Sequence, residues 1–196
     1  MKHISISHIA IDDNRDMPRR QREREAVSRL LATINPDYRL AHRHDGSPFI
    51  EDHPEITLSI THSTTTAAVA ITTLPDTLLG IDLESPRAAL ASTYDRWSNP
   101  ADVIPSTDSP MPRCPDASKS QSNEAPNLHQ LLKLWTAKEA AYKARAPHHP
   151  DRQIFLPDIA VDLVSSTATL PDGTTLALSF RALPPDQILA IATIKK

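Results

Sequence analysis

A pair of carboxylates in the segment Leu79–Glu84 is the first group of residues suited to chemistry. Leucine and isoleucine alternate there with Gly80, Asp82 and Glu84, and this period of two predicts a strand with one apolar and one acidic face. Gly80 lies on the acidic face, where a residue without a side chain often marks the close approach of a ligand or of another backbone. The segment therefore presents two carboxylates on one side of a strand.

A third carboxylate belongs to a predicted helix further along the chain. Glu139 and Lys143 are four residues apart, so they lie on the same helical face. With Asp82 and Glu84, Glu139 would supply the oxygen ligands that Mg²⁺ prefers, and the rest of its coordination shell would be open to water and phosphate. The same residues also fit a plainer interpretation, because a Glu–Lys pair on a helix surface contributes only about 0.2–0.5 kcal/mol. Spacing alone leaves both interpretations open.

Possible phosphate-binding residues occur in two other segments. Thr61, His62 and Ser63 end a predicted strand and carry the donor types that suit a phosphate group, although a single histidine there is more often structural. Six arginines lie in the segment 15–29. They form either the solvated face of a helix or a site for phosphate or an acidic partner.

The pattern of apolar residues predicts the elements that must position these groups. Strands are expected at 4–11, 56–61, 67–73, 78–84, 159–163, 167–170, 175–181 and 188–194, and helices at 18–34 and 127–145. The segment 98–127 is rich in proline, serine, aspartate and asparagine, so we expect a long mobile loop. Two blocks of helix plus strands flank that loop, which predicts an α+β fold of two similar lobes, residues 1–85 and 86–196.

The composition narrows the class of protein. The net charge of −3 argues against a globally basic nucleic-acid-binding protein. Cys114 is the only cysteine, which excludes a disulfide framework and a multi-cysteine zinc site, and the pair His42 and His44 lacks a third well-spaced ligand. We see no apolar run typical of a signal peptide or of a membrane span. We therefore expect a soluble cytoplasmic protein with no nucleic-acid or membrane partner.

The two main segments together closely resemble the paired signature of the phosphopantetheinyl transferases. Residues 80–84, Gly-Ile-Asp-Leu-Glu, match its glycine-(Ile/Val)-Asp-x-Glu run, and residues 135–143, Trp-Thr-Ala-Lys-Glu-Ala-Ala-Tyr-Lys, match its Trp-Ser-x-Lys-Glu-x-x-x-Lys run. Residues 46–48 and 60–63 look like the additional motifs of the longer, surfactin-synthetase-activating class. Four motifs in the family's order make the resemblance specific.

This resemblance implies a fold and an activity. The fold would be two α+β lobes related by a pseudo-twofold axis, with coenzyme A held in the cleft between them. The activity would be the Mg²⁺-dependent transfer of 4'-phosphopantetheine from coenzyme A, the donor substrate, to a serine of an apo acyl or peptidyl carrier protein, with release of 3',5'-ADP. Because both lobes belong to one chain, a monomer would be sufficient.

The resemblance also implies roles for the acids and lysines. Asp82, Glu84 and Glu139 would bind Mg²⁺ together with the pyrophosphate of coenzyme A. Glu139, or a water on the metal, would be the base that deprotonates the carrier serine. Lys138 and Lys143 would offset charge on the pyrophosphate and on the departing 3',5'-ADP. Attack on a phosphorus surrounded by anionic oxygens needs such cations where charge accumulates.

Other residues would bind the far end of coenzyme A. By resemblance, His62 with Thr61 would contact the 3'-phosphate, and Arg20 or Arg24 would be the basic residue that grips it. Ser47 stands where the family usually has a lysine, which removes one phosphate contact. Two alternatives therefore stay open: a catalytically weak relative that binds coenzyme A or a carrier protein without turnover, and an unrelated Mg²⁺-dependent phosphohydrolase.

Overall fold

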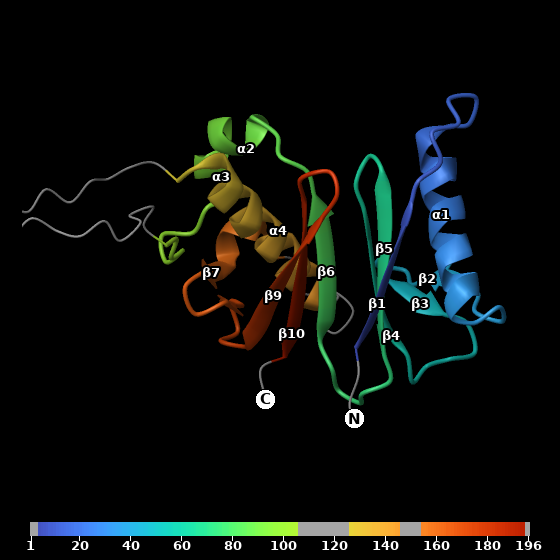
Figure 1. Ribbon diagram of the computed structural model, residues 1–196. Coiled ribbons are helices and arrows are strands. Elements are labelled where there is room, and N and C mark those ends of the chain that lie inside the picture. The colour runs from blue at the N-terminus through green and yellow to red at the C-terminus, as the bar shows by residue number, and fades with distance from the viewer. Residues whose placement is uncertain (1–3, 106–125, 146–153, 195–196) are drawn as a thin grey trace, which may run out of the picture.

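Four layers build the fold in the order helix, sheet, sheet, helix (Figure 1). The structure is a computed structural model that describes residues 4–105, 126–145 and 154–194. Helix α1 (Arg19–Ile34) is one outer layer and helix α4 (Leu128–Arg145) is the other. The fold is therefore mixed α+β, which confirms the fold class predicted from the sequence. No helix among these residues is long and apolar enough to cross a membrane.

The sheet beneath α1 has three antiparallel strands. Their order is β1 (Ser5–Ala10), β5 (Thr66–Thr72) and β4 (Thr57–His62), and a small two-stranded sheet, β2 (Leu40–His42) with β3 (Pro48–Ile50), lies beside them. Every residue of β5 is buried. Strand β5 is covered on both faces, by α1 on one side and by the second sheet on the other, so its sequence is almost continuously apolar.

The second sheet has five strands and packs against α4. Their order is β6 (Leu79–Glu84), β10 (Gln187–Ile194), β9 (Thr175–Leu183), β8 (Thr167–Thr169) and β7 (Ala160–Asp162). Strand β6 pairs antiparallel with β10, although the expected boundary at residue 85 assigns β6 to the N-terminal lobe. That boundary therefore does not separate the two sheets, because β6 crosses into the sheet formed by the C-terminal half.

The two faces of β6 have different partners, as the alternation predicts. Leu79, Ile81 and Leu83 are buried in the apolar cluster between the sheets. Gly80 faces α4, where a methyl group added to it would lie 2.0 Å from the carbonyl oxygen of Ala140. The close approach expected at this glycine is thus an approach of another backbone. Only a residue without a side chain lets α4 lie this near the acidic face of the strand.

Side-chain hydroxyls, rather than a backbone ladder, join the described parts of β4 and β6. The backbone N–H of Ile81 donates to Ser59 Oγ at 3.0 Å, and that of Leu83 donates to Thr61 Oγ1 at 3.1 Å. Both hydroxyls come from the predicted strand at 56–61. The two sheets therefore meet next to the segment that carries the acids.

All ten predicted strands and helices are present in the structure, within a residue or two at their ends. The sequence pattern missed short elements: β2, β3, the single-turn helices α2 (Ala89–Ser92) and α3 (Tyr94–Trp97), and a 3-10 turn at Leu156–Asp158. A segment of three or four residues is too short to display a hydrophobic period.

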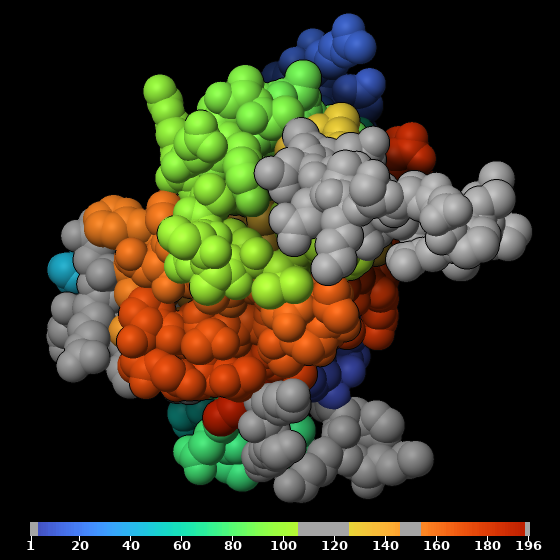
Figure 2. Space-filling view, turned by 90° about the vertical axis from the view of Figure 1, so that its left-hand side faces the viewer, coloured from blue at the N-terminus to red at the C-terminus, as the bar shows by residue number. Residues whose placement is uncertain are grey.

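The beginning of the expected mobile loop is docked on the molecule. Val103 receives a hydrogen bond from the backbone N–H of Leu163 at 2.9 Å and donates one to Val161 at 2.9 Å. Figure 2 shows this part of the chain lying against the C-terminal strands. Residues 98–105 are therefore ordered, because the edge strand β7 offers them backbone partners. Most of the rest of the expected loop, residues 106–125, lies outside the described residues.

Candidate functional site

Asp82 is the centre of a polar cluster between β6, β4 and α4. Its Oδ1 lies 2.6 Å from the ammonium Nζ of Lys143 and accepts a hydrogen bond from Thr61 Oγ1 at 3.1 Å. Its other oxygen, Oδ2, is buried without a hydrogen-bond partner among the described residues. A buried carboxylate oxygen without a partner is costly, since such atoms are normally satisfied. This oxygen therefore marks a place where a cation would be stabilised.

Two glutamates complete an acidic group around Asp82. Glu84 Oε1 accepts hydrogen bonds from Trp135 Nε1 at 3.3 Å and from the Arg87 guanidinium at 3.1 Å. Burial and then the negative charge of Asp82 raise the pKa of Glu84. Burial raises the pKa of Glu139 too, followed by the charge of Asp82, while Lys143 partly offsets that charge. Asp82 is thus close enough to both glutamates for its charge to oppose their ionisation.

The acidic group fits a divalent cation by its chemistry. Among residues 4–105, 126–145 and 154–194, no three acid, histidine or cysteine side chains already converge as a set of metal ligands. Asp82, Glu84 and Glu139 nevertheless offer only oxygen donors, one of which lacks a partner, and their mutual repulsion would be relieved by positive charge. These are the residues that would hold Mg²⁺.

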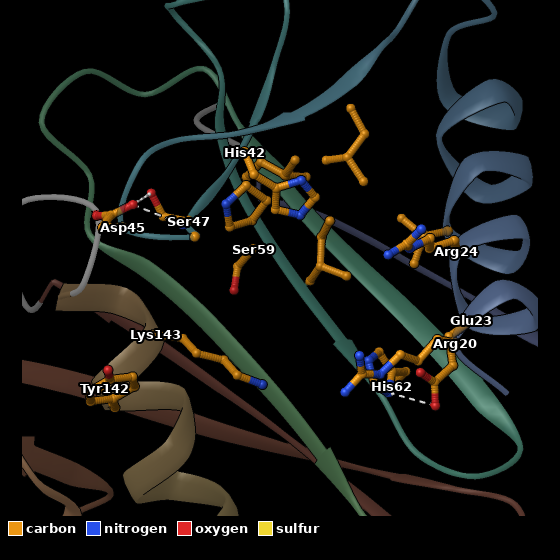
Figure 3. A pocket seen from close by; sticks show the side chains of 16 residues that line it. Arg20, Glu23, Arg24, His42, Asp45, Ser47, Ser59, His62, Tyr142 and Lys143 are labelled. Carbon is orange, nitrogen blue, oxygen red and sulfur yellow. Dashed lines mark hydrogen bonds and ion pairs between the residues drawn. The ribbon is translucent and has the colours of Figure 1, made fainter.

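A pocket of about 630 Å³ lies on the far side of Lys143, which lines it, whereas Asp82, Glu84 and Glu139 do not (Figure 3). Helix α1, the β2–β3 hairpin, β4 and the end of α4 supply its walls. Its polar lining includes Arg20, Arg24, His42, Ser47, His62 and Lys143. Four of the residues that the sequence nominated from separate segments, Arg20, Ser47, His62 and Lys143, therefore line one cavity.

Positive charge lies on opposite sides of this pocket. Figure 3 shows Arg20, Arg24 and His62 on the side of α1 and β4, with Lys143 facing them from α4. Within the described chain, neither Arg20 nor Arg24 has a hydrogen bond or an ion pair. Two guanidinium groups without partners at the edge of a cavity are suited to an anion such as phosphate. Two arginines of the arginine-rich segment therefore line the pocket, while their side chains stay exposed.

Ser47 has a structural use in the turn before β3. Its hydroxyl donates to Asp45 Oδ1 at 2.7 Å and its backbone N–H donates to the same oxygen at 2.9 Å, and these bonds lower the pKa of Asp45. The next residue back, Gly46, has φ of 82°, the left-handed region that favours glycine in a turn. The serine hydroxyl thus tightens the hairpin at the pocket wall, and it supplies no positive charge there.

Lys138 lies away from the pocket, contrary to the role that the resemblance gives it. Its side chain is fully buried, with Nζ 2.9 Å from Asp102 Oδ1 and a hydrogen bond to the carbonyl of Ile159. Burial lowers the pKa of Lys138, although Asp102 opposes that shift. The ammonium group therefore ties α4 to the docked segment and to the start of β7, and it has no free face for a ligand.

Thr61 also differs from its expected role. The residue is 3% exposed and does not line the pocket, while its hydroxyl contacts Asp82 and lies 3.4 Å from Lys143 Nζ. Alternation along β4 turns Thr61 toward β6, whereas His62 faces the opposite way, toward α1. Thr61 thus supports the acidic group, and only His62 of this pair reaches the cavity.

Glu23 was missed from the sequence, although its helical spacing from the nominated Arg20 and Arg24 places it on the same face. Arg20, Glu23, Arg24 and Val27 recur at i, i+3, i+4 and i+7 and line the pocket together. That spacing defines one face of a helix. His42 carried no comparable signal, because its strand has only three residues.

Comparison with known proteins adds no relative. No protein-family model matches the sequence, and no curated protein matches it. The family resemblance therefore depends on the motifs themselves and on how their residues lie in space.

Proposed function

We propose that this chain is a Mg²⁺-dependent 4'-phosphopantetheinyl transferase that acts on an apo acyl or peptidyl carrier protein. One observation carries the proposal. Ser47, His62 and Lys143, from three of the four motifs, line a single pocket, and Lys143 bonds to Asp82 of the fourth. Residues far apart in the sequence are gathered here in a way that their individual secondary structures do not require.

The positions of the cationic side chains around the pocket match the two anionic groups of coenzyme A. Its adenosine carries a 3'-phosphate on the ribose and a pyrophosphate at the 5' position, so its negative charges fall into two separate groups. Arg20, Arg24 and His62 would bind the 3'-phosphate from α1 and β4. Lys143 would bind the pyrophosphate from α4, beside the acidic group. This match between two anionic groups and two cationic sides of the pocket supports coenzyme A as the donor substrate.

The fold is consistent with the family's architecture in this proposal. The sheet under α1 and the sheet under α4 would be the two lobes related by a pseudo-twofold axis, and the pocket would belong to the cleft between them. A helix packed on an antiparallel sheet occurs on each side. Because α1 and α4 belong to one chain, we propose that a cytoplasmic monomer carries the activity.

The reaction needs a base and positive charge at the pyrophosphate. The carrier serine oxygen would form a bond to the phosphorus that bears pantetheine, and the bond from that phosphorus to the oxygen of 3',5'-ADP would break. Glu139 would accept the serine proton, directly or through a water. Lys143 would stabilise the charge left on 3',5'-ADP. Bound Mg²⁺ would neutralise the pyrophosphate oxygens beside Asp82, Glu84 and Glu139.

A transfer assay tests the proposal. The protein is incubated with coenzyme A, Mg²⁺ and a panel of apo carriers from fatty-acid, polyketide and peptide synthesis, and each carrier is weighed by mass spectrometry. We expect one phosphopantetheine to be added, with no addition to a carrier whose acceptor serine is alanine or when the metal is chelated. A carrier mass that never changes across the panel contradicts the proposal.

A second candidate is a binding protein without turnover. It is favoured by Ser47, whose hydroxyl is used inside the hairpin and brings no cation to the pocket. Tight binding of coenzyme A together with unchanged carriers would support it. Release of phosphate from coenzyme A would instead identify a phosphohydrolase.

A further inference from the structure

The structure assigns Glu23 as a positioning residue that holds the imidazole of His62 for an anionic ligand. This inference rests on the proposed function, because the ligand is the 3'-phosphate of coenzyme A. Glu23 Oε1 lies 3.4 Å from His62 Nδ1 (Figure 3). The same oxygen lies 2.6 Å from Arg19 Nε. Contacts thus connect Arg19 on the outer surface of α1, through Glu23, to His62 in the pocket.

A carboxylate in the wall of this pocket requires an explanation. Glu23 is only 8% exposed, yet it lines a cavity that also contains the guanidinium groups of Arg20 and Arg24, which have no partner among the residues that the structure describes. A lone negative charge there would repel a phosphate and would be costly to bury. Its pairing with both Arg19 and His62 removes that objection. The carboxylate then contacts the imidazole and the Arg19 guanidinium, and these groups offset its repulsion of an anionic ligand.

The chemistry of the imidazole fixes which nitrogen serves the ligand. An ionised carboxylate only accepts hydrogen bonds, so its position 3.4 Å from Nδ1 favours the tautomer with the hydrogen on that nitrogen. Nε2 is then the nitrogen left for the pocket. When the ring carries a hydrogen on each nitrogen, Nε2 can donate to a phosphate oxygen. Without Glu23, the ring would be free to turn and to exchange its tautomers.

An ordinary helix-surface ion pair does not account for these contacts. Arg19 and Glu23 are four residues apart, which is the usual spacing for such a pair. The side chain of Arg19 is 60% exposed, but that of Glu23 is only 10% exposed because it turns beneath the helix toward β4. His62 is contributed by that strand, and the helix alone does not bring the two residues together.

Ligand binding with and without the 3'-phosphate tests the inference. Glu23→Ala should weaken the affinity for coenzyme A by about 5–10-fold, because the imidazole loses the carboxylate that positions it, and that for 3'-dephospho-coenzyme A by less than about twofold. The kcat of transfer should stay within about twofold, so the change lies in KM. Glu23→Gln keeps an acceptor and should restore most of the affinity. Isothermal titration calorimetry supplies the binding constants.

Two further variants make the result specific. Glu25→Ala removes an exposed glutamate of the same helix and should change neither affinity. In a His62→Ala background, Glu23→Ala should have no additional effect, because the two residues act as one unit. If Glu23→Ala lowers the melting temperature, Glu23→Met, which fills similar volume without an acceptor, replaces it.

The outcomes separate this inference from the proposed function. Equal losses for both ligands, or additive losses with His62→Ala, overturn the positioning role while leaving the transferase proposal intact. A wild-type protein that binds no coenzyme A and modifies no carrier overturns the proposed function and this inference together.

Discussion

Two lysines of helix α4 each pair with a buried aspartate, but the two pairs differ in what remains unsatisfied. Asp102, the partner of Lys138, also accepts backbone N–H groups of Asn99 at 2.7 Å and Val161 at 2.8 Å. Asp82, the partner of Lys143, keeps one buried oxygen without a partner. The first pair is complete and holds elements together. The second is incomplete and lies beside a pocket. The comparison therefore distinguishes an ion pair that holds elements together from one that a ligand could complete.

The largest expected effect is on the incomplete pair. Replacing Asp82 with alanine removes an acid proposed to hold the metal, and transfer should fall at least about 1,000-fold, or about 4 kcal/mol in activation free energy. The fold should persist, which circular dichroism checks, because removing this side chain also removes an unsatisfied buried oxygen. Glu139→Ala should behave in the same way. Near-normal turnover of either variant at saturating Mg²⁺ would refute the metal assignment.

The complete pair should show the opposite pattern. Lys138→Ala leaves Asp102 buried and without its cation, which should lower the free energy of unfolding by about 3 kcal/mol, measured by urea denaturation. Lys143→Ala is the matched variant on the same helix. It should cost about 1–2 kcal/mol of stability, less than Lys138→Ala because the Lys143 side chain is 31% exposed and water can take its place beside Asp82, but about 100-fold in transfer. Equal effects of the two changes on stability would erase the distinction.

Gly80→Ala tests whether stability and transfer both depend on the close approach of α4 to β6. The added methyl group would lie 2.0 Å from the oxygen of Ala140 and 2.3 Å from the nitrogen of Ala144, so the helix must move. We expect a loss of about 1–3 kcal/mol in stability. Because Glu139 and Lys143 move with the helix, transfer should fall too. Gly173→Ala is the control for a glycine with open space around it, although its φ of 84° adds local strain.

The smallest effect is a pH-dependent gain in stability from Glu139→Gln. The pKa of Glu139 is raised by burial and by Asp82, so ionisation of this carboxyl disfavours the folded state. That cost is absent below the ordinary glutamate pKa of about 4.3 and develops as the pH rises through the folded-state pKa. Without Mg²⁺, the variant should be more stable than the wild type at pH 8, by less than about 1 kcal/mol because the side chain is partly exposed.

The pH series distinguishes this cause from a change in packing. The difference in melting temperature between Glu139→Gln and wild type should shrink to zero as the pH falls toward 4. Added Mg²⁺ should stabilise the wild type more than the variant. A difference that is independent of pH would show that the carboxyl charge is not its source.

The sequence predicted the elements of the fold better than their partners. Alternation in the segment Leu79–Glu84 correctly separated an apolar from an acidic face, because that pattern is local. It did not predict that β6 pairs with β10, since pairing joins residues more than a hundred positions apart. Strands β2 and β3 were missed because three residues do not define a period.

The site residues show the same contrast between local spacing, which the sequence predicts, and contacts with distant segments, which it does not. Spacing correctly placed Glu139 and Lys143 on the face that meets Asp82. The motif alone could not reveal that Lys138 points to Asp102, because helical spacing does not state which segment lies beneath each face. Helical spacing placed Glu23 beside Arg20 and Arg24, but it could not reveal the contact with His62, which depends on how α1 packs on β4.

The hydroxyl of Thr61 makes one hydrogen bond where the two sheets meet and another to the acidic group. It receives the N–H of Leu83 where the sheets meet, and it donates to the carboxylate of Asp82. Sliding of one sheet past the other must stretch the first bond, and the second is made by the same oxygen atom. The orientation of this acid is therefore linked to the spacing of the sheets, so a movement that separates β4 from β6 would also turn the carboxylate of Asp82.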